Sequence, residues 1–168
     1  RVIKELKEIN KPFVILLNSA NPMSEDAKKL SKELEQKHMV PVVLVNCEEL
    51  GAEDINRIIE TVLFEFPICE IRVKMPGWVT KLDKEHWLCN SIYEHLNSAM
   101  KDAEKIRDSR EFCSCMRECQ YLEDVEIDGM DLGQGKVYIE VKPQAELFYK
   151  ILGEITGLEI ENEKKLVD

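Results

Sequence analysis

Polar side chains with hydrogen-bonding groups follow two apolar stretches of the sequence, at the points where those stretches end. The apolar stretches are residues 12–17 and 41–45. The polar residues at their ends are Asn18 and Asn46. Because open parallel sheets bind ligands beyond the carboxyl ends of their strands, these two amide groups are candidates for contact with a small ligand. The sequence therefore predicts a binding site where the two stretches end.

Both stretches have the composition of strands in a parallel sheet. They are rich in β-branched residues and do not alternate with polar ones, which is typical of strands covered on both faces. A helix that Ser24 can cap lies between them and makes a right-handed crossover. A second helix is expected over 54–66, and an alternating edge strand over 71–75. Three strands are too few for a complete doubly wound sheet, and Arg1 lies inside an amphipathic pattern, so we expect the rest of the sheet upstream.

A phosphate-binding loop would be the next requirement for nucleotide chemistry. Such a loop needs glycines that aim backbone N–H groups at the anion, followed by Lys and then Ser or Thr at the start of a helix. The nearest match, residues 129–136, has Met130 where glycine is required and Val137 where Ser or Thr is required. The residues on both sides alternate as strands do, so this stretch is predicted to turn a β-hairpin. We therefore expect no phosphate loop in this chain.

The composition disfavours several classes of partner. A length of 168 residues with 44% hydrophobic content suits one or two small globular domains. The formal charge of -10 disfavours binding to nucleic acids and to anionic lipid surfaces. The longest apolar run is far shorter than the ~18 residues that span a membrane, and no secretion leader opens the sequence. We expect a cytoplasmic chain with no nucleic-acid partner.

The cysteines leave a second, unrelated interpretation open. Cysteines in a chain of this kind are expected to be reduced thiols. A zinc site drawn from Cys113, Cys115, Cys119 and either His86 or Cys89 is conceivable from the residue types. The spacing matches no common zinc knuckle, and the first two cysteines would face different sides of a helix. We predict no metal site, while the alternative of a free-standing thiol-dependent or zinc-dependent regulatory domain stays open.

After Met75 the pattern of elements changes. Pro76 and Gly77 interrupt the chain, and one long helix is predicted over 80–107, with a short helix over 112–122. The hairpin comes next. A last helix, opened by Pro143 at its first position and closed by Gly157, completes the pattern.

These elements indicate a small helix–hairpin–helix α+β domain after the α/β segment. We place the two domains at residues 1–76 and 77–168. Helices are expected to cover one face of the hairpin sheet, which leaves the other face open as a partly acidic surface. The residues predicted on that open face are Glu126, Asp128, Tyr138 and Glu140.

Residues with catalytic chemistry are sparse. His38, His86 and His95 each lack a neighbouring catalytic motif, and the sequence contains neither a nucleophile elbow nor a His-Glu-x-x-His zinc helix. The carboxylates alternate with lysines at helical spacing, as on ordinary solvated helix faces. We therefore predict no catalytic residue in this segment.

Five stretches of the sequence together resemble one bacterial family. The stretches are residues 10–22, 40–47, 63–68, 86–88 and 147–157. They resemble stage IV sporulation protein A, the spore-coat morphogenetic ATPase family of endospore-forming bacteria, over essentially the whole chain. The resemblance implies the last part of a P-loop NTPase-like ATPase domain, similar to translation-factor GTPases, followed by the family's middle domain.

The resemblance also gives the first polar cluster a chemical meaning. In translation-factor GTPases an Asn-Lys-x-Asp motif reads guanine, and the matching stretch here is Asn18-Ser19-Ala20-Asn21. Without the acid, the pair of hydrogen bonds that selects guanine is lost, which argues against GTP selectivity. The resemblance therefore implies that Asn18, Ser19 and Asn21 contact the base of ATP, with Asn46 and Cys47 in the second base-contacting loop.

The resemblance further implies the setting in which the chain works. The full-length protein is expected to bind ATP and Mg²⁺, to hydrolyse ATP, and to polymerise on the forespore surface in the mother-cell cytoplasm. Expected partners are further copies of itself and other spore-coat morphogenetic proteins. Membrane contact is expected indirectly, through a small amphipathic peptide bound elsewhere in the protein. The phosphate-binding and magnesium-binding residues match nothing here, so this segment alone is expected to bind no cofactor and to hydrolyse no ATP.

Overall fold

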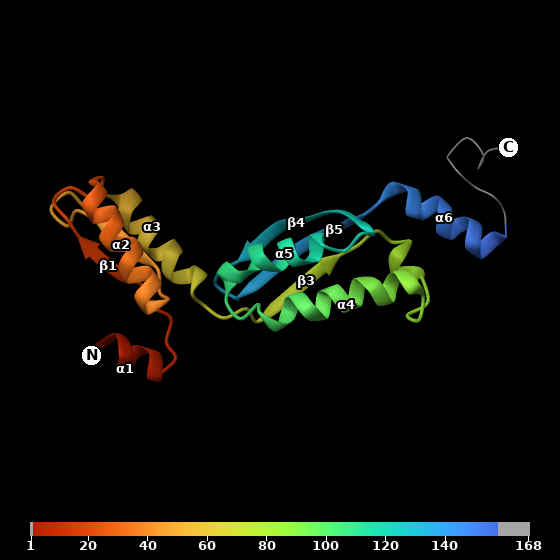
Figure 1. Ribbon diagram of the computed structural model, residues 1–168, viewed down its shortest axis with the longest axis horizontal. Helices are drawn as coiled ribbons and strands as arrows, with labels where there is room; N and C mark the ends of the chain where they lie inside the picture. Colours follow the sequence, from red (N-terminus) through yellow and green to blue (C-terminus); the bar gives the residue numbers. More distant parts are fainter. Residues whose placement is uncertain (1, 158–168) are drawn as a thin grey trace. The chain divides into compact units, whose positions relative to one another are not determined.

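The computed structural model describes residues 2–157, and the chain divides after Pro67 into two compact units (Figure 1). The first unit is α/β and the second is α+β, as the sequence predicted. The division falls earlier than the predicted break at Pro76, because the strand between the two positions pairs within the second unit.

The first unit is a βαβα arrangement preceded by a short helix. Its helices are α1 (Val2–Glu8), α2 (Glu25–His38) and α3 (Ala52–Phe64), and its strands are β1 (Ile15–Asn18) and β2 (Val42–Val45). The two strands are parallel, with Ile15 opposite Val42 and Asn18 opposite Val45. The carboxyl ends of both strands therefore lie at the same edge of the sheet.

Local signals in the sequence fix the ends of α2 and α3. The Ser24 hydroxyl accepts a hydrogen bond from the N–H of Ala27 at 3.3 Å, as predicted for the cap of α2. At the other end Met39 adopts a left-handed conformation with φ 53° and donates its N–H to Glu35. Asp54 accepts from the N–H of Gly51 at the start of α3. These caps hold the loops that follow each strand in a defined path.

Burial in the first unit is less complete than the sequence predicted. Val43 and Val45 on β2 are buried, but Leu16 on β1 is 49% exposed. On α3 the side chains of Ile55 and Ile59 are 45% and 52% exposed. The prediction that both strands are covered on both faces is therefore wrong for β1 within the described residues.

The second unit contains a three-stranded sheet in the order β3-β5-β4. Its strands are β3 (Glu70–Lys74), β4 (Leu122–Asp131) and β5 (Lys136–Pro143). β3 runs parallel to β5, and β4 runs antiparallel to β5. The prediction that residues 71–75 form a third strand of the first sheet is wrong, because Ile71 and Val73 pack against the core of the second unit.

The β-hairpin predicted around the glycines is confirmed. Strands β4 and β5 meet at a turn in which the N–H of Gln134 donates to the Asp131 carboxylate at 3.0 Å. Gly135 lies in the left-handed region with φ 65°, where a glycine has no steric cost. Irregularities interrupt the pairing of β4 between Leu122 and Asp124 and between Ile127 and Gly129.

The helices of the second unit are shorter than predicted. They are α4 (Trp87–Lys101), α5 (Ser109–Arg117) and α6 (Ala145–Thr156), with 3₁₀ turns η1 (Val79–Lys81) and η2 (Ile106–Asp108). The long helix over 80–107 was therefore a wrong prediction. His86 ends the preceding loop by accepting a hydrogen bond from the N–H of Leu88 through its ring nitrogen Nδ1, so the helix begins after it.

The ends of the other two helices also differ from the prediction. α5 stops at Arg117, short of the predicted end at Leu122, which begins β4. Pro143 closes β5, and Gln144 takes the cap position of α6. Gly157 closes α6 with φ 72°, as predicted.

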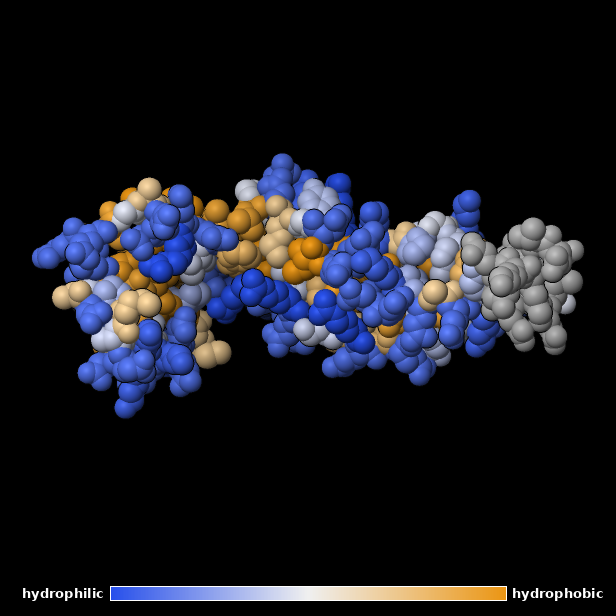
Figure 2. All heavy atoms as spheres, turned by 90° about the horizontal axis from the view of Figure 1, so that it is seen from above, coloured by the Kyte–Doolittle hydropathy of each residue, from blue (hydrophilic) through white to orange (hydrophobic). Residues whose placement is uncertain are grey.

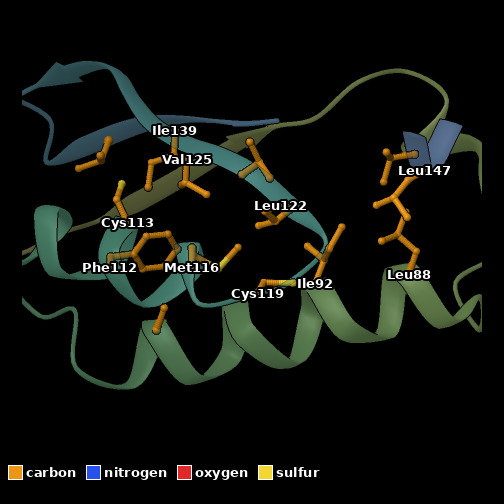
Figure 3. Packing of buried hydrophobic residues seen from close by; sticks show 14 of the residues in the cluster. Leu88, Ile92, Phe112, Cys113, Met116, Cys119, Leu122, Val125, Ile139 and Leu147 are labelled. Carbon is orange, nitrogen blue, oxygen red and sulfur yellow. The ribbon is translucent and has the colours of Figure 1, made fainter. Parts of the chain in front are cut away.

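The core of the second unit is packed between its helices and one face of its sheet (Figure 3). Phe112 and Met116 project from α5 toward Val125 and Ile139 on the strands. α4 adds the buried side chains of Leu88 and Ile92, and α6 adds Leu147. Hydrophilic residues cover much of the visible surface of each unit, with smaller apolar areas among these residues (Figure 2). Among residues 2–157 no helix is long and apolar enough to cross a membrane.

Candidate functional site

The predicted polar residues gather at the carboxyl ends of β1 and β2. The side-chain oxygen of Asn18 accepts a hydrogen bond from the backbone N–H of Cys47 at 3.0 Å. The N–H of Ser19 donates to the carbonyl of Val45 at 2.9 Å. The end of β1 is thus tied directly to the loop that follows β2, as the parallel pairing requires.

Asn21 belongs to the same network through Ser19. The Ser19 hydroxyl accepts a hydrogen bond from the N–H of Asn21 at 3.2 Å, and the carbonyl of Asn21 accepts from the N–H of Ser24 at 3.1 Å. The residues from the end of β1 to the cap of α2 are therefore held in one hydrogen-bonded turn. The side chain of Asn21 lies at the surface of this turn.

Asn46 uses its amide group within its own loop. Its Oδ1 accepts from the N–H of Glu48 at 3.1 Å, and its Nδ2 donates to the Glu49 carboxylate at 3.1 Å. These two bonds use one of the two amide N–H groups and one of the two lone pairs of Oδ1. Asn46 therefore lies directly after β2, as predicted, and its amide group hydrogen-bonds within its own loop.

Arg57, which was not predicted as part of this site, joins α3 to strand β2. The Arg57 guanidinium donates to the carbonyl of Leu44 at 3.1 Å and to the Asp54 carboxylate at 2.8 Å. The signal was available as an Asp and an Arg three positions apart at the start of a helix. Asn18 and the Cys47 thiol are exposed at the strand ends. This exposed edge can donate and accept hydrogen bonds to a ligand.

Comparison with known proteins assigns both units. Residues 1–67 match the ATPase-domain model of stage IV sporulation protein A, and residues 68–168 match the middle-domain model of the same protein. The chain belongs to the stage IV sporulation protein A family. Its two family segments meet at the position where the structure divides.

Three stage IV sporulation proteins A are similar over nearly the whole chain. The protein from Clostridioides difficile strain 630 is 40% identical over 167 residues, or 99% of this chain. Those from Bacillus anthracis and Bacillus subtilis strain 168 are each 32% identical, over 99% and 100% of the chain. The chain spans about a third of each relative's length, 34% in all three. No solved structure matches the chain.

The cysteine cluster of this family member lies in the core of the middle domain. Cys113 and Cys119 are buried and Cys115 is half-buried. Burial raises the pKa of the Cys113 thiol, an effect that Arg117 partly opposes, and it raises the pKa of Cys89 as well. Neutral thiols are poor metal ligands. Within residues 2–157, no three cysteine, histidine or acidic side chains are grouped as a metal site would require.

The open face of the middle-domain sheet carries both signs of charge. Glu126 and Asp128 are exposed as predicted, while Tyr138 and Glu140 are half-buried. Basic residues that were not predicted for this face lie beside these acids. Lys142 lies 2.8 Å from Glu126, and Lys74 of β3 lies 3.0 Å from Glu140. Acidic and basic side chains form ion pairs across this face, so the face is not an acidic patch.

The His-Trp pair noted in the sequence joins α4 to α6. The indole N–H of Trp87 donates to the Glu154 carboxylate at 3.1 Å, and the ring nitrogen Nε2 of His86 lies 3.8 Å from the same group. The ammonium of Lys150 lies 5.1 Å from the centre of the Trp87 ring. These contacts position the last described helix against the start of α4.

Proposed function

We propose that the first unit supplies the base side of an ATP-binding pocket and that the second unit is an assembly domain of the same protein. The observation that carries the first half is the hydrogen bond from the Cys47 N–H to the Asn18 side chain. This bond fixes the two strand ends as one edge, in a unit that matches the family's ATPase domain. Ligands of open α/β sheets bind at such an edge.

The residue types at this edge support adenine over guanine. The Asn18-Ser19-Ala20-Asn21 stretch resembles the guanine-reading motif of translation-factor GTPases without its Lys and its Asp. The Asn18 oxygen is engaged with the loop after β2, which leaves its amide nitrogen as the group to meet a base. Asn21 offers a neutral amide where guanine readers hold a carboxylate, so the paired acceptor for guanine is missing.

The rest of the nucleotide machinery belongs elsewhere in the full-length protein. The described residues carry no grouped carboxylates that would hold Mg²⁺. In the proposal the phosphate-binding and magnesium-binding groups come from other parts of the ATPase domain, and this segment alone hydrolyses no ATP. The full-length protein hydrolyses ATP, polymerises with further copies of itself on the forespore surface in the cytoplasm of the mother cell, and has other spore-coat morphogenetic proteins as partners. Any membrane contact is indirect, through a bound amphipathic peptide.

Nucleotide selectivity of the full-length protein tests the base-pocket proposal. Asn21→Asp restores the carboxylate that accepts two hydrogen bonds from guanine. We expect the affinity for GTP relative to ATP to rise about tenfold or more, the effect of one charge-assisted hydrogen bond of ~1.5–3 kcal/mol. Fluorescent-nucleotide titration measures both affinities. Asn56→Asp makes the same change on the exposed surface of α3 and should leave the ratio unaltered. An unchanged ratio in Asn21→Asp would place the base elsewhere.

Two substitutions at Asn18 separate base contact from loop support. Asn18→Asp keeps an oxygen for the Cys47 N–H but loses the amide donor, whereas Asn18→Ala loses both. We expect Asn18→Asp to weaken ATP binding with little loss of thermal stability, and Asn18→Ala to reduce both. If Asn18→Asp binds ATP as tightly as the wild type, Asn18 supports the loop and does not touch the base.

A further inference from the structure

Strand β3 forms one edge of the middle-domain sheet. It pairs with β5 on one side, and among residues 2–157 no strand pairs with its other side. The backbone N–H and C=O groups on the outer side of an edge strand are a template for another strand. The side chains of Arg72 and Lys74 are 57% and 69% exposed, and Cys69 just before the strand is also exposed. The part of the sheet face beside this edge is therefore exposed to solvent.

Strand β4, at the opposite edge, is protected against pairing with another copy of itself. Two irregularities interrupt its register, and such bulges twist an edge away from flat pairing. It also carries five acidic residues and no basic one. Those acids are Glu123, Asp124, Glu126, Asp128 and Asp131. Like charges opposed across a strand pair are destabilising, so β4 disfavours a second β4.

The sequence of β3 has the opposite property, because it is complementary to itself. β3 reads Glu70-Ile-Arg-Val-Lys74. If two copies pair antiparallel about Arg72, Glu70 of each copy lies opposite Lys74 of the other. On the core side of the sheet, Ile71 lies opposite Val73. Opposite charges and β-branched pairs across strands are both favourable.

Arg72 on the symmetry axis is directed away from the edge. Its Nε lies 2.7 Å from a Glu70 carboxylate oxygen. Its guanidinium carbon lies 5.9 Å from the ring centre of Tyr138, on the neighbouring strand β5. The two arginines of a pair would therefore turn toward their own sheets, so their like charges do not oppose the contact.

We propose that the β3 edge of the middle domain pairs antiparallel with the β3 edge of a second copy, centred on Arg72. The proposal rests on the assembly role proposed above and names its surface. Pro67 and Pro76 bracket the strand and limit pairing to a short segment. The contact is thus weak by itself and gains strength when other contacts join the same copies. Because a two-fold contact closes on itself, it makes pairs, and a polymer needs a second contact as well.

Charge reversal with mixing tests this register in the 168-residue chain. Glu70→Lys places lysine opposite lysine between identical copies, and Lys74→Glu places glutamate opposite glutamate. We expect each variant alone to stay monomeric at concentrations where the wild type associates. An equimolar mixture restores both opposite-charge pairs, so association should return. Sedimentation velocity over a concentration series measures the average mass in each sample.

Matched variants on the same open face serve as controls. Glu126→Lys and Lys142→Glu reverse the charges of an ion pair on β4 and β5, away from the β3 edge, and should associate like the wild type. Circular dichroism and unfolding curves establish that all four variants fold. If Glu126→Lys weakens association and Glu70→Lys strengthens it, β3 pairs with the acidic β4 edge and the proposal is wrong.

The remaining outcomes separate this contact from the wider proposed function. A wild-type chain that stays monomeric overturns the β3 contact, and the base-pocket proposal still depends on its own nucleotide titrations. A wild-type chain that associates, with both β3 variants behaving like it, keeps the assembly role and removes β3 as its surface. Failure of the mixture to associate, with both single variants monomeric and folded, rejects the two-fold register.

Discussion

The two units of this chain differ in how they use their apolar side chains. In the second unit, Leu88 and Ile139 are fully buried and Phe112 is 2% exposed, between the helices and one face of the sheet. In the first unit, Leu16 and Ile59 remain about half exposed although they belong to a strand and a helix of the same βαβα arrangement. The middle domain therefore closes its own core. The first unit leaves part of its apolar surface exposed within the described residues.

The same contrast applies to the chemistry that each unit offers. Polar groups of the first unit converge at one sheet edge, where loops carry side chains that are not needed for packing. The polar groups of the second unit are spread over a sheet face and are largely engaged in ion pairs, such as that of Lys74 with Glu140. Polar groups gathered at the carboxyl ends of two strands suit a small ligand. A sheet face and the outer side of an edge strand suit another protein.

The largest expected effect comes from comparing the same type of substitution, leucine to alanine, in each unit. Leu88→Ala removes a fully buried side chain from the middle-domain core, and we expect it to cost about 2–5 kcal/mol of unfolding free energy. Leu16→Ala removes a side chain that is 49% exposed, and we expect about 1 kcal/mol or less. Chemical denaturation, followed by probes in each unit, measures both.

The contrast fails if the two substitutions have similar effects. A large loss for Leu16→Ala would mean that the first unit closes a core of its own around β1. The same two substitutions in the full-length protein test the cause of the contrast. There, a further layer over β1 should raise the cost of Leu16→Ala toward that of Leu88→Ala, while the cost of Leu88→Ala stays constant.

Local patterns predicted much of the fold. The β-hairpin followed from alternation around the glycines before Lys136, and Ser24 and Gly157 were identified as helix caps. These features depend on a few neighbouring residues, which sequence reasoning can weigh. The strand ends bearing Asn18 and Asn46 were also placed correctly, because the parallel pairing brings them to one edge.

Features that depend on distant contacts were predicted less well. The alternation of residues 70–74 fits an edge strand in either sheet, and nothing local indicates that Ile71 and Val73 belong to the core of the second unit. The apolar periodicity of the sequence continues past Lys101, where α4 ends. Ile106 fits that periodicity, but it is buried from a 3₁₀ turn and not from the helix. The engagement of the Asn46 amide with Glu48 and Glu49 likewise depends on the path of its loop.

The smallest expected effect is the loss of middle-domain stability at acid pH that comes from Asp124. The hydrogen bond from the Val125 N–H lowers the pKa of this carboxyl below its ordinary value, and contacts with Glu126 and Arg117 act in the same direction. A folded-state pKa below the unfolded value means that the ionised carboxylate favours folding. This contribution is present above the unfolded pKa of about 3.9 and is lost as the pH falls through the folded value.

The substitution Asp124→Asn isolates the charge, because the new amide cannot titrate while its oxygen can still accept a hydrogen bond from the Val125 N–H. We expect the variant to show a shallower loss of middle-domain stability below about pH 4 than the wild type, with the same fold. Asp128→Asn makes the same change on the same strand and is the matched control. Thermal unfolding of the second unit between neutral and acid pH measures the slopes. Because the Asp124 side chain is 34% exposed to solvent, added salt should shrink the part of the difference that comes from the charge of Arg117, and equal slopes for Asp124→Asn and the wild type would contradict a charge effect at this position.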